Sequence, residues 1–191
     1  MDSQKINWKI FFKNPEAAKA DDFLRAFNSW IPDSPEVFID VADYKHVHDG
    51  PLTVLVGHYV TYSLDASGRR LGLLYSRNRA PEGGAVSVVA TFNEVLKTAK
   101  RVEEDKTLNG VRFQTNEFLF LINDRAAFPN NDETFRSLRG ELDLLFSSLF
   151  GKGGYTLTRN ADHKQRFQVT VSGKSSLTLN DLCEKSLKAS R

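Results

Sequence analysis

The sequence predicts an α+β fold: a mostly antiparallel sheet of about seven or eight strands, with three main helices packed on one face and a short C-terminal helix beside them. Two observations predict it. Short segments with the residue alternation of strands are numerous, and most follow one another closely enough to form hairpins. Three longer segments carry apolar residues at helical spacing, and helices of that length can shield one face of such a sheet.

In the first half of the chain, the pattern of apolar residues predicts strands separated by one helix. The strands are expected at residues 6–12, 37–41, 53–64 and 71–75. The segment 37–41 is apolar on both faces, which favours a central position in the sheet, and 53–64 is expected to be one long strand. A stripe of apolar residues from Phe23 to Ile31 predicts a helix that ends before Pro32.

The second half predicts two hairpins, two long helices and a tail. The helices are expected at residues 88–102 and 135–149, and the hairpins pair 111–113 with 118–122 and 155–158 with 166–171. Ser87 is a candidate N-cap of the first helix, and Asn130 with Glu133 resembles a capping box for the second. We therefore expect residues 1–172 to form a single domain, and residues 173–191 to form a linker with an amphipathic helix.

Composition limits the class of protein and its compartment. The formal net charge of the 191 residues is +2 and the basic residues are scattered, which does not favour nucleic-acid binding. The single cysteine, Cys183, excludes an internal disulfide and a cysteine-based zinc site. No apolar run approaches the ~18 residues of a membrane span, and the N-terminus lacks the apolar region of a signal peptide. We therefore expect a soluble, cytoplasmic protein that does not bind membranes.

The stretch around the second predicted strand concentrates residues that could carry chemistry. His46 and His48 are spaced so that both imidazoles can lie on one side of an extended segment and chelate a divalent metal, with His58 as a third ligand. Asp40, on an apolar strand, and Asp43 are candidate catalytic acids or bases, because a buried unpaired carboxylate has a raised pKa. The alternative is that these histidines and aspartates only form turns, pack in the core or make ion pairs.

Two further clusters could bind a ligand or a partner. Arg125 and Asn130 precede a predicted helix N-terminus, where free N–H groups favour a phosphate or carboxylate; the alternative is capping together with a surface ion pair. Leu179, Leu182 and Leu187 lie along the tail helix, which could dock either on its own domain or on a protein partner.

Four segments resemble a group of uncharacterised bacterial proteins of similar length. They are IDVADYKHVHDGP at 39–51, LVGH at 55–58, LGLLY at 71–75 and FLINDR at 120–125. The resemblance would extend from Ile6 to Val171, and it implies a bacterial origin and a single-domain build. It implies no activity, and it carries no catalytic residue across.

These observations leave three hypotheses for function. The first is a binding, accessory or interaction protein that could self-associate through a sheet edge or the tail helix, because the sequence lacks the Walker loop, Gly-x-Ser-x-Gly and His-Glu-x-x-His motifs. The second is a metal-dependent hydrolase that uses the three histidines as ligands and one of the two aspartates as base. The third is a small-ligand sensor with its pocket between the sheet and the helices.

Overall fold

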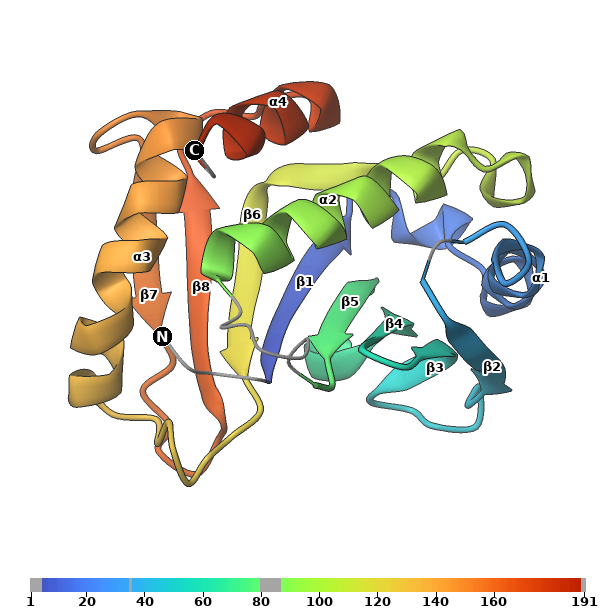
Figure 1. Cartoon of the computed structure of the whole chain (residues 1–191), viewed down its shortest axis with the longest axis horizontal. Helices are drawn as coiled ribbons and strands as arrows, with labels where there is room; N and C mark the ends of the chain where they lie inside the picture. Colours follow the sequence, from blue (N-terminus) through green and yellow to red (C-terminus); the bar gives the residue numbers. More distant parts are fainter. Residues whose placement is uncertain (1–4, 35, 80–86, 190–191) are drawn as a thin grey trace.

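The computed structural model describes residues 5–34, 36–79 and 87–189, and within them it shows the α+β architecture that the sequence predicts (Figure 1). The strands are β1 (Ile6–Phe12), β2 (Phe38–Asp43), β3 (Pro51–Gly57), β4 (Val60–Asp65), β5 (Gly72–Arg77), β6 (Phe113–Ile122), β7 (Tyr155–Arg159) and β8 (Phe167–Gly173). The helices are α1 (Ala20–Trp30), α2 (Val88–Glu104), α3 (Asp132–Phe150) and α4 (Leu179–Ala189). None of these helices is long and apolar enough to span a membrane.

The strands form one antiparallel sheet in the order β2-β3-β4-β5-β1-β6-β8-β7. β1 lies in its interior, between β5 and β6, and every residue of β1 is buried. Figure 1 shows α2 crossing the middle of the sheet, with α1 beside β2 and β3 and α3 beside β7. β1 and β2 lie four places apart in the sheet order and do not pair, so the helix α1 between them connects strands that are not neighbours.

The core lies between the sheet and the helices and is built largely from aromatic rings. Trp8 of β1 packs against Phe92 of α2, with ring centroids 4.9 Å apart, and against Phe120 of β6 at 4.8 Å. Phe146 of α3 lies 5.5 Å from Phe92. Edge-to-face and tilted contacts of this kind add to the stability that burial of the rings provides. The alternation in β1 therefore correctly indicates the face on which the helices pack.

Two strand predictions are wrong, and the two errors cancel in the number of strands. Residues 53–64 form not one strand but β3 and β4, which turn sharply at His58 and Tyr59. The turn needs glycine at position 57, because a Cβ there would lie 2.6 Å from the carbonyl oxygen of Val60. The hairpin expected within 111–122 is instead the single strand β6, and the pairing of β1 with β6 shifts in register between Ile10 and Phe12.

The predicted position of the segment 37–41 is also wrong. Its apolar pattern predicts the centre of the sheet, yet β2 is an edge strand. Val37 and Ile39 expose 66% and 63% of their surfaces. An apolar run is common to central strands and to edge strands that expose part of their side chains, so composition alone does not separate the two.

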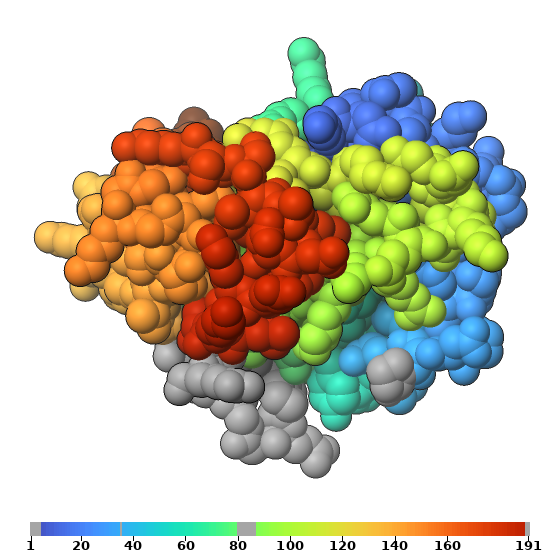
Figure 2. Space-filling view, turned by 90° about the horizontal axis from the view of Figure 1, so that it is seen from above, coloured from blue at the N-terminus to red at the C-terminus, as the bar shows by residue number. Residues whose placement is uncertain are grey.

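The tail helix α4 packs on its own domain, against α2 and α3, and Figure 2 shows it lying across them. Leu182 is fully buried in this contact and Leu179 is largely buried, whereas Leu187 is half exposed. The ammonium of Lys185 donates to the carbonyl oxygen of Leu149 at 3.0 Å, at the C-terminal end of α3. Two of the three leucines proposed as an interaction surface therefore serve the fold itself.

Candidate functional site

The structure does not assemble the three-histidine metal site. His46 and His48 are exposed in the loop before β3, and His58 is exposed in the turn after it. β3 has 7 residues, so it separates the two ends by roughly 23 Å at about 3.3 Å per residue. Among the residues that the structure describes, no group of three His, Cys, Asp or Glu side chains could hold a metal ion. Adjacency in sequence was misleading because a full strand separates the candidates.

The two aspartates proposed as acid or base are also surface residues. Asp40 is exposed on the edge strand, where its carboxylate accepts the backbone N–H of Val41 at 2.8 Å. Asp43 accepts the backbone N–H of Lys45 at 3.0 Å, and its other oxygen lies 3.1 Å from the Lys45 ammonium. These hydrogen bonds hold the pKa of Asp43 below its usual value, which makes the carboxylate a weaker base.

The proposed anion site before α3 is not assembled either. Arg125 is exposed, while the amide nitrogen of Asn130 donates to the carbonyl oxygens of Asn160 and Asp162 at 3.0 and 2.8 Å. Asn130 therefore fixes the loop after β7. The N-cap of α3 is the next residue, Asn131, whose side-chain oxygen accepts the backbone N–H of Thr134 at 2.9 Å, so the capping box predicted for Asn130 and Glu133 is wrong.

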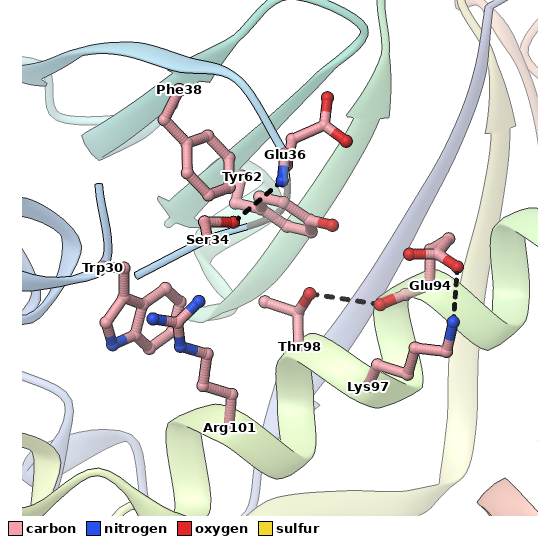
Figure 3. Close-up of a pocket in the computed structure, with 9 residues that line it drawn as sticks. All are labelled: Trp30, Ser34, Glu36, Phe38, Tyr62, Glu94, Lys97, Thr98 and Arg101. Atoms are coloured by element: carbon pink, nitrogen blue, oxygen red, sulfur yellow. Dashed lines mark hydrogen bonds and ion pairs between the residues drawn. The ribbon is translucent and has the colours of Figure 1, made fainter. Parts of the chain in front are cut away.

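A pocket of about 280 Å³ lies where α1 ends, between β2, β4 and α2 (Figure 3). The first of its walls comes from α1 and from the connection between α1 and β2, the second from the sheet and the third from α2. The lining residues are Trp30, Ser34, Glu36, Phe38, Tyr62, Glu94, Lys97, Thr98 and Arg101. This is the position, between sheet and helices, that the small-ligand hypothesis requires.

One side of the pocket carries a cation held on an aromatic ring. The Arg101 guanidinium lies over the Trp30 ring, 4.3 Å from its centroid, as Figure 3 also shows. The indole N–H of Trp30 donates to Asp105 at 2.7 Å, which fixes the plane of the ring. Burial lowers the pKa of Arg101 and nearby Asp105 opposes that shift, so arginine stays cationic at neutral pH.

The opposite side carries an acid and a phenol. Glu36 lies two residues after Ser34, whose hydroxyl oxygen accepts the Glu36 backbone N–H at 3.2 Å. One carboxylate oxygen of Glu36, Oε1, is buried and has no hydrogen-bond partner among the described residues. Burial raises the pKa of Tyr62; a side-chain hydrogen bond with Thr98 opposes that shift, and the negative charges of Glu94 and Glu36 add to it. The Tyr62 hydroxyl therefore stays protonated and remains a hydrogen-bond donor at neutral pH.

Glu94 and Lys97 lie at the mouth of the pocket and form an ion pair at 2.8 Å, with 43% and 64% of their side chains exposed. An exposed pair of this kind contributes little to stability, on the order of 0–1 kcal/mol. Next to it, the hydroxyl of Thr98 donates to the Glu94 carbonyl at 3.1 Å. Among the described residues that line the pocket, Glu36 and Arg101 are the charged side chains that make no ion pair, although the carboxylates of Asp105 and Asp33 act on Arg101 from nearby.

A larger hollow of about 670 Å³ lies on the sheet face that the helices leave open, and its polar floor is already paired. The Lys9 ammonium lies 2.6 Å from Asp65 Oδ1 and donates to the Ser67 carbonyl at 2.9 Å. The other Asp65 oxygen accepts the Ser67 hydroxyl at 2.8 Å. Because these groups satisfy one another, the hollow offers a ligand less than the helix-side pocket does.

The sequence carried only a partial signal for this pocket. Glu94, Lys97, Thr98 and Arg101 are spaced i, i+3, i+4, i+7, so they share one face of α2. Such a polar stripe is ordinary on a helix that faces solvent. Trp30 lies in the apolar stripe of the first predicted helix and Tyr62 in the predicted strand 53–64, and neither pattern points to a pocket. Their meeting with this stripe depends on packing between segments more than 30 residues apart.

Comparison with protein-family models gives no match for this chain, and a search of curated proteins gives none either. The resemblance to the group of bacterial proteins therefore stays a prediction, and the functional argument depends on the geometry of the helix-side pocket.

Proposed function

We propose that this protein binds a small organic molecule in the pocket between α1, β2, β4 and α2, and that it acts by binding, as a sensor or carrier. The observation that carries the proposal is the buried Oε1 atom of Glu36, which lines the pocket without a hydrogen-bond partner among the described residues. A buried charged oxygen left without a partner is costly, typically more than the ~1–3 kcal/mol of a neutral group. A ligand that donates a hydrogen bond to Glu36 would remove that cost.

The volume of the pocket supports a small ligand. Sites for drug-sized ligands occupy ~300–1,000 Å³, and this pocket measures about 280 Å³. That space suits a single small metabolite and is too small for a dinucleotide. The aromatic walls from Trp30, Phe38 and Tyr62 supply the apolar contact that small-molecule sites usually contain.

The protonation states support recognition over catalysis. The raised pKa of Tyr62 makes its hydroxyl a donor and a poor source of a phenolate base at neutral pH. The Arg101 guanidinium is likewise a permanent donor. Together these groups can orient a ligand through hydrogen bonds and charge.

Thermal unfolding in the presence of a panel of metabolites tests the proposal. At a concentration of 100 Kd, a ligand stabilises the folded state by about 2.7 kcal/mol, which raises the melting temperature of a domain of this size by roughly 5–11 °C. Phe38→Ala removes an aromatic wall of the pocket and should abolish the shift. Gln168→Ala, in the open-face hollow, is the matched control and should retain it. Ligands that stabilise the Phe38→Ala variant as much as the wild type would place the site elsewhere.

A second candidate function is self-association of two copies through β2. It is favoured by the exposed side chains of Ile39 on the edge strand β2 and of Val37 just before it, since such edges are templates for pairing. The carboxylate of Asp40 already occupies the Val41 N–H, which limits the backbone ladder that a second copy could form. Sedimentation equilibrium over a wide concentration range would test this candidate. Dimers that persist in an Ile39→Lys variant would exclude the β2 edge as the interface.

A further inference from the structure

The pocket holds two opposite charges that do not meet. Glu36 and Arg101 both line it, yet no ion pair joins them, and within the described chain neither side chain makes an ion pair with any other residue. Figure 3 shows the carboxylate of Glu36 and the guanidinium of Arg101 on different sides of the pocket, with the Tyr62 ring between them. The charged pair Glu94–Lys97, by contrast, is closed on itself. The interior of the pocket is therefore dipolar.

The Arg101 side is built for a carboxylate. A guanidinium presents several N–H donors in one plane and binds carboxylates in a two-pronged arrangement. Stacking on Trp30 fixes that plane, and the hydrogen bond from Trp30 to Asp105 fixes the ring in turn. The Arg101 guanidinium makes no hydrogen bond to another described residue, and the nearby carboxylates of Asp105 and Asp33 help to keep it charged.

The Glu36 side is built for an ammonium group. The buried Oε1 atom can accept a hydrogen bond, and the carboxylate supplies the opposite charge. The rings of Phe38 and Tyr62 pack with centroids 6.1 Å apart beside it, and aromatic faces attract cations as well. The same rings form an apolar surface on which the body of a ligand can pack.

We infer that the ligand is a small zwitterion, a free α-amino acid with an apolar side chain, whose ammonium group binds Glu36 and whose carboxylate binds Arg101. The inference depends on the proposed function, because it names the class of molecule for that same pocket. A ligand with only an amine or only an acid would leave one of the two charges without a partner. A zwitterion satisfies both, and the aromatic rings receive its side chain.

Calorimetric titration of the full chain with four probes tests this inference. L-leucine and L-phenylalanine carry both charges, phenethylamine carries only the amine, and 3-phenylpropionate carries only the carboxylate. Loss of a charge-assisted hydrogen bond weakens binding by roughly tenfold to a hundredfold. We therefore expect phenethylamine and 3-phenylpropionate each to bind at least about tenfold more weakly than L-phenylalanine.

Variants assign each charge to its residue. Glu36→Gln should weaken L-phenylalanine roughly tenfold or more while leaving 3-phenylpropionate nearly unchanged, because that probe has no ammonium group. Arg101→Gln should likewise weaken L-phenylalanine while leaving phenethylamine nearly unchanged, because that probe has no carboxylate. Arg101→Lys keeps the charge but loses the planar arrangement of donors, so an intermediate affinity is expected. Lys100→Gln, on the same helix but outside the pocket, is the matched control and should change the affinity less than about threefold, as an exposed charge paired with Glu104 contributes little. Each variant is first checked for an unchanged unfolding midpoint.

The outcomes separate this inference from the proposed function. If phenethylamine or 3-phenylpropionate binds as tightly as L-phenylalanine, the zwitterion is wrong while small-molecule binding stands. The same holds if all four probes fail but a metabolite that is not an amino acid stabilises the wild type and not Phe38→Ala. If no compound stabilises the wild type in a manner that depends on Phe38, both the inference and the proposed function fail.

Discussion

Replacing Lys9 with methionine is expected to destabilise the fold by about 3 kcal/mol, because it leaves the carboxylate of Asp65 buried without its counter-ion. Both side chains are 2% exposed, and their ion pair measures 2.6 Å. Breaking such a buried pair typically costs about 3–5 kcal/mol. The lower end applies here because Asp65 keeps two hydrogen bonds from Ser67, from its backbone N–H at 3.1 Å and from its hydroxyl at 2.8 Å.

Urea denaturation followed by circular dichroism measures this loss in the free energy of unfolding, and urea is chosen because it is uncharged and does not screen the ion pair. For a domain of this size, about 3 kcal/mol corresponds to a loss of roughly 6–12 °C in melting temperature. The double variant Lys9→Met with Asp65→Leu removes both charges and is expected to recover most of the loss, because a buried ion pair is often no more stable than apolar residues of similar volume. A Lys9→Met variant within about 1 kcal/mol of the wild type would refute this account of the pair.

Three further changes test other parts of the structure. Leu182→Ala should cost about 2–5 kcal/mol and speed the reaction of Cys183, the next residue of α4, with thiol reagents, because burial of α4 against the domain raises the pKa of that thiol. An unchanged reaction rate would show that α4 is not held by this contact. Burial and the hydrogen bond to Asp143 raise the pKa of Tyr155 to about 12, so the stability this residue contributes is full below pH 10 and falls between pH 10 and 12. An absorbance titration should therefore lose a step near pH 12 in Tyr155→Phe, and an identical curve would contradict the assignment. Gly57→Ala should destabilise by about 1–3 kcal/mol in urea, since its Cβ would lie 2.6 Å from a carbonyl oxygen across the turn; a neutral effect would show that the turn relaxes easily.

Local pattern was sufficient for much of the fold. The alternation in residues 6–12 identifies a buried strand and its helix-facing side, and the stripe at 135–149 identifies α3. Both signals come from the periods of side chains along a strand and a helix, which the chain carries in itself. The same periods predict the mostly antiparallel α+β class.

The errors arose where the outcome depends on contacts between segments. The division of 53–64 at Gly57, the continuity of β6 and the edge position of β2 are decided by which strands pair and in what register. A run of apolar residues satisfies several such arrangements about equally well, so the sequence pattern does not choose among them.

The candidate site shows more clearly the difference between what local pattern decides and what contacts between distant segments decide. The sequence by itself determined the class of fold, the helices and the polar stripe on α2, because each depends on residues close together in the chain. Only the tertiary structure decided that His46 and His58 lie at opposite ends of β3, and that Trp30, Glu36 and Arg101 line one pocket. A binding site is made by side chains whose separation in space is set by packing of the whole domain, and local periodicity carries no information about that distance.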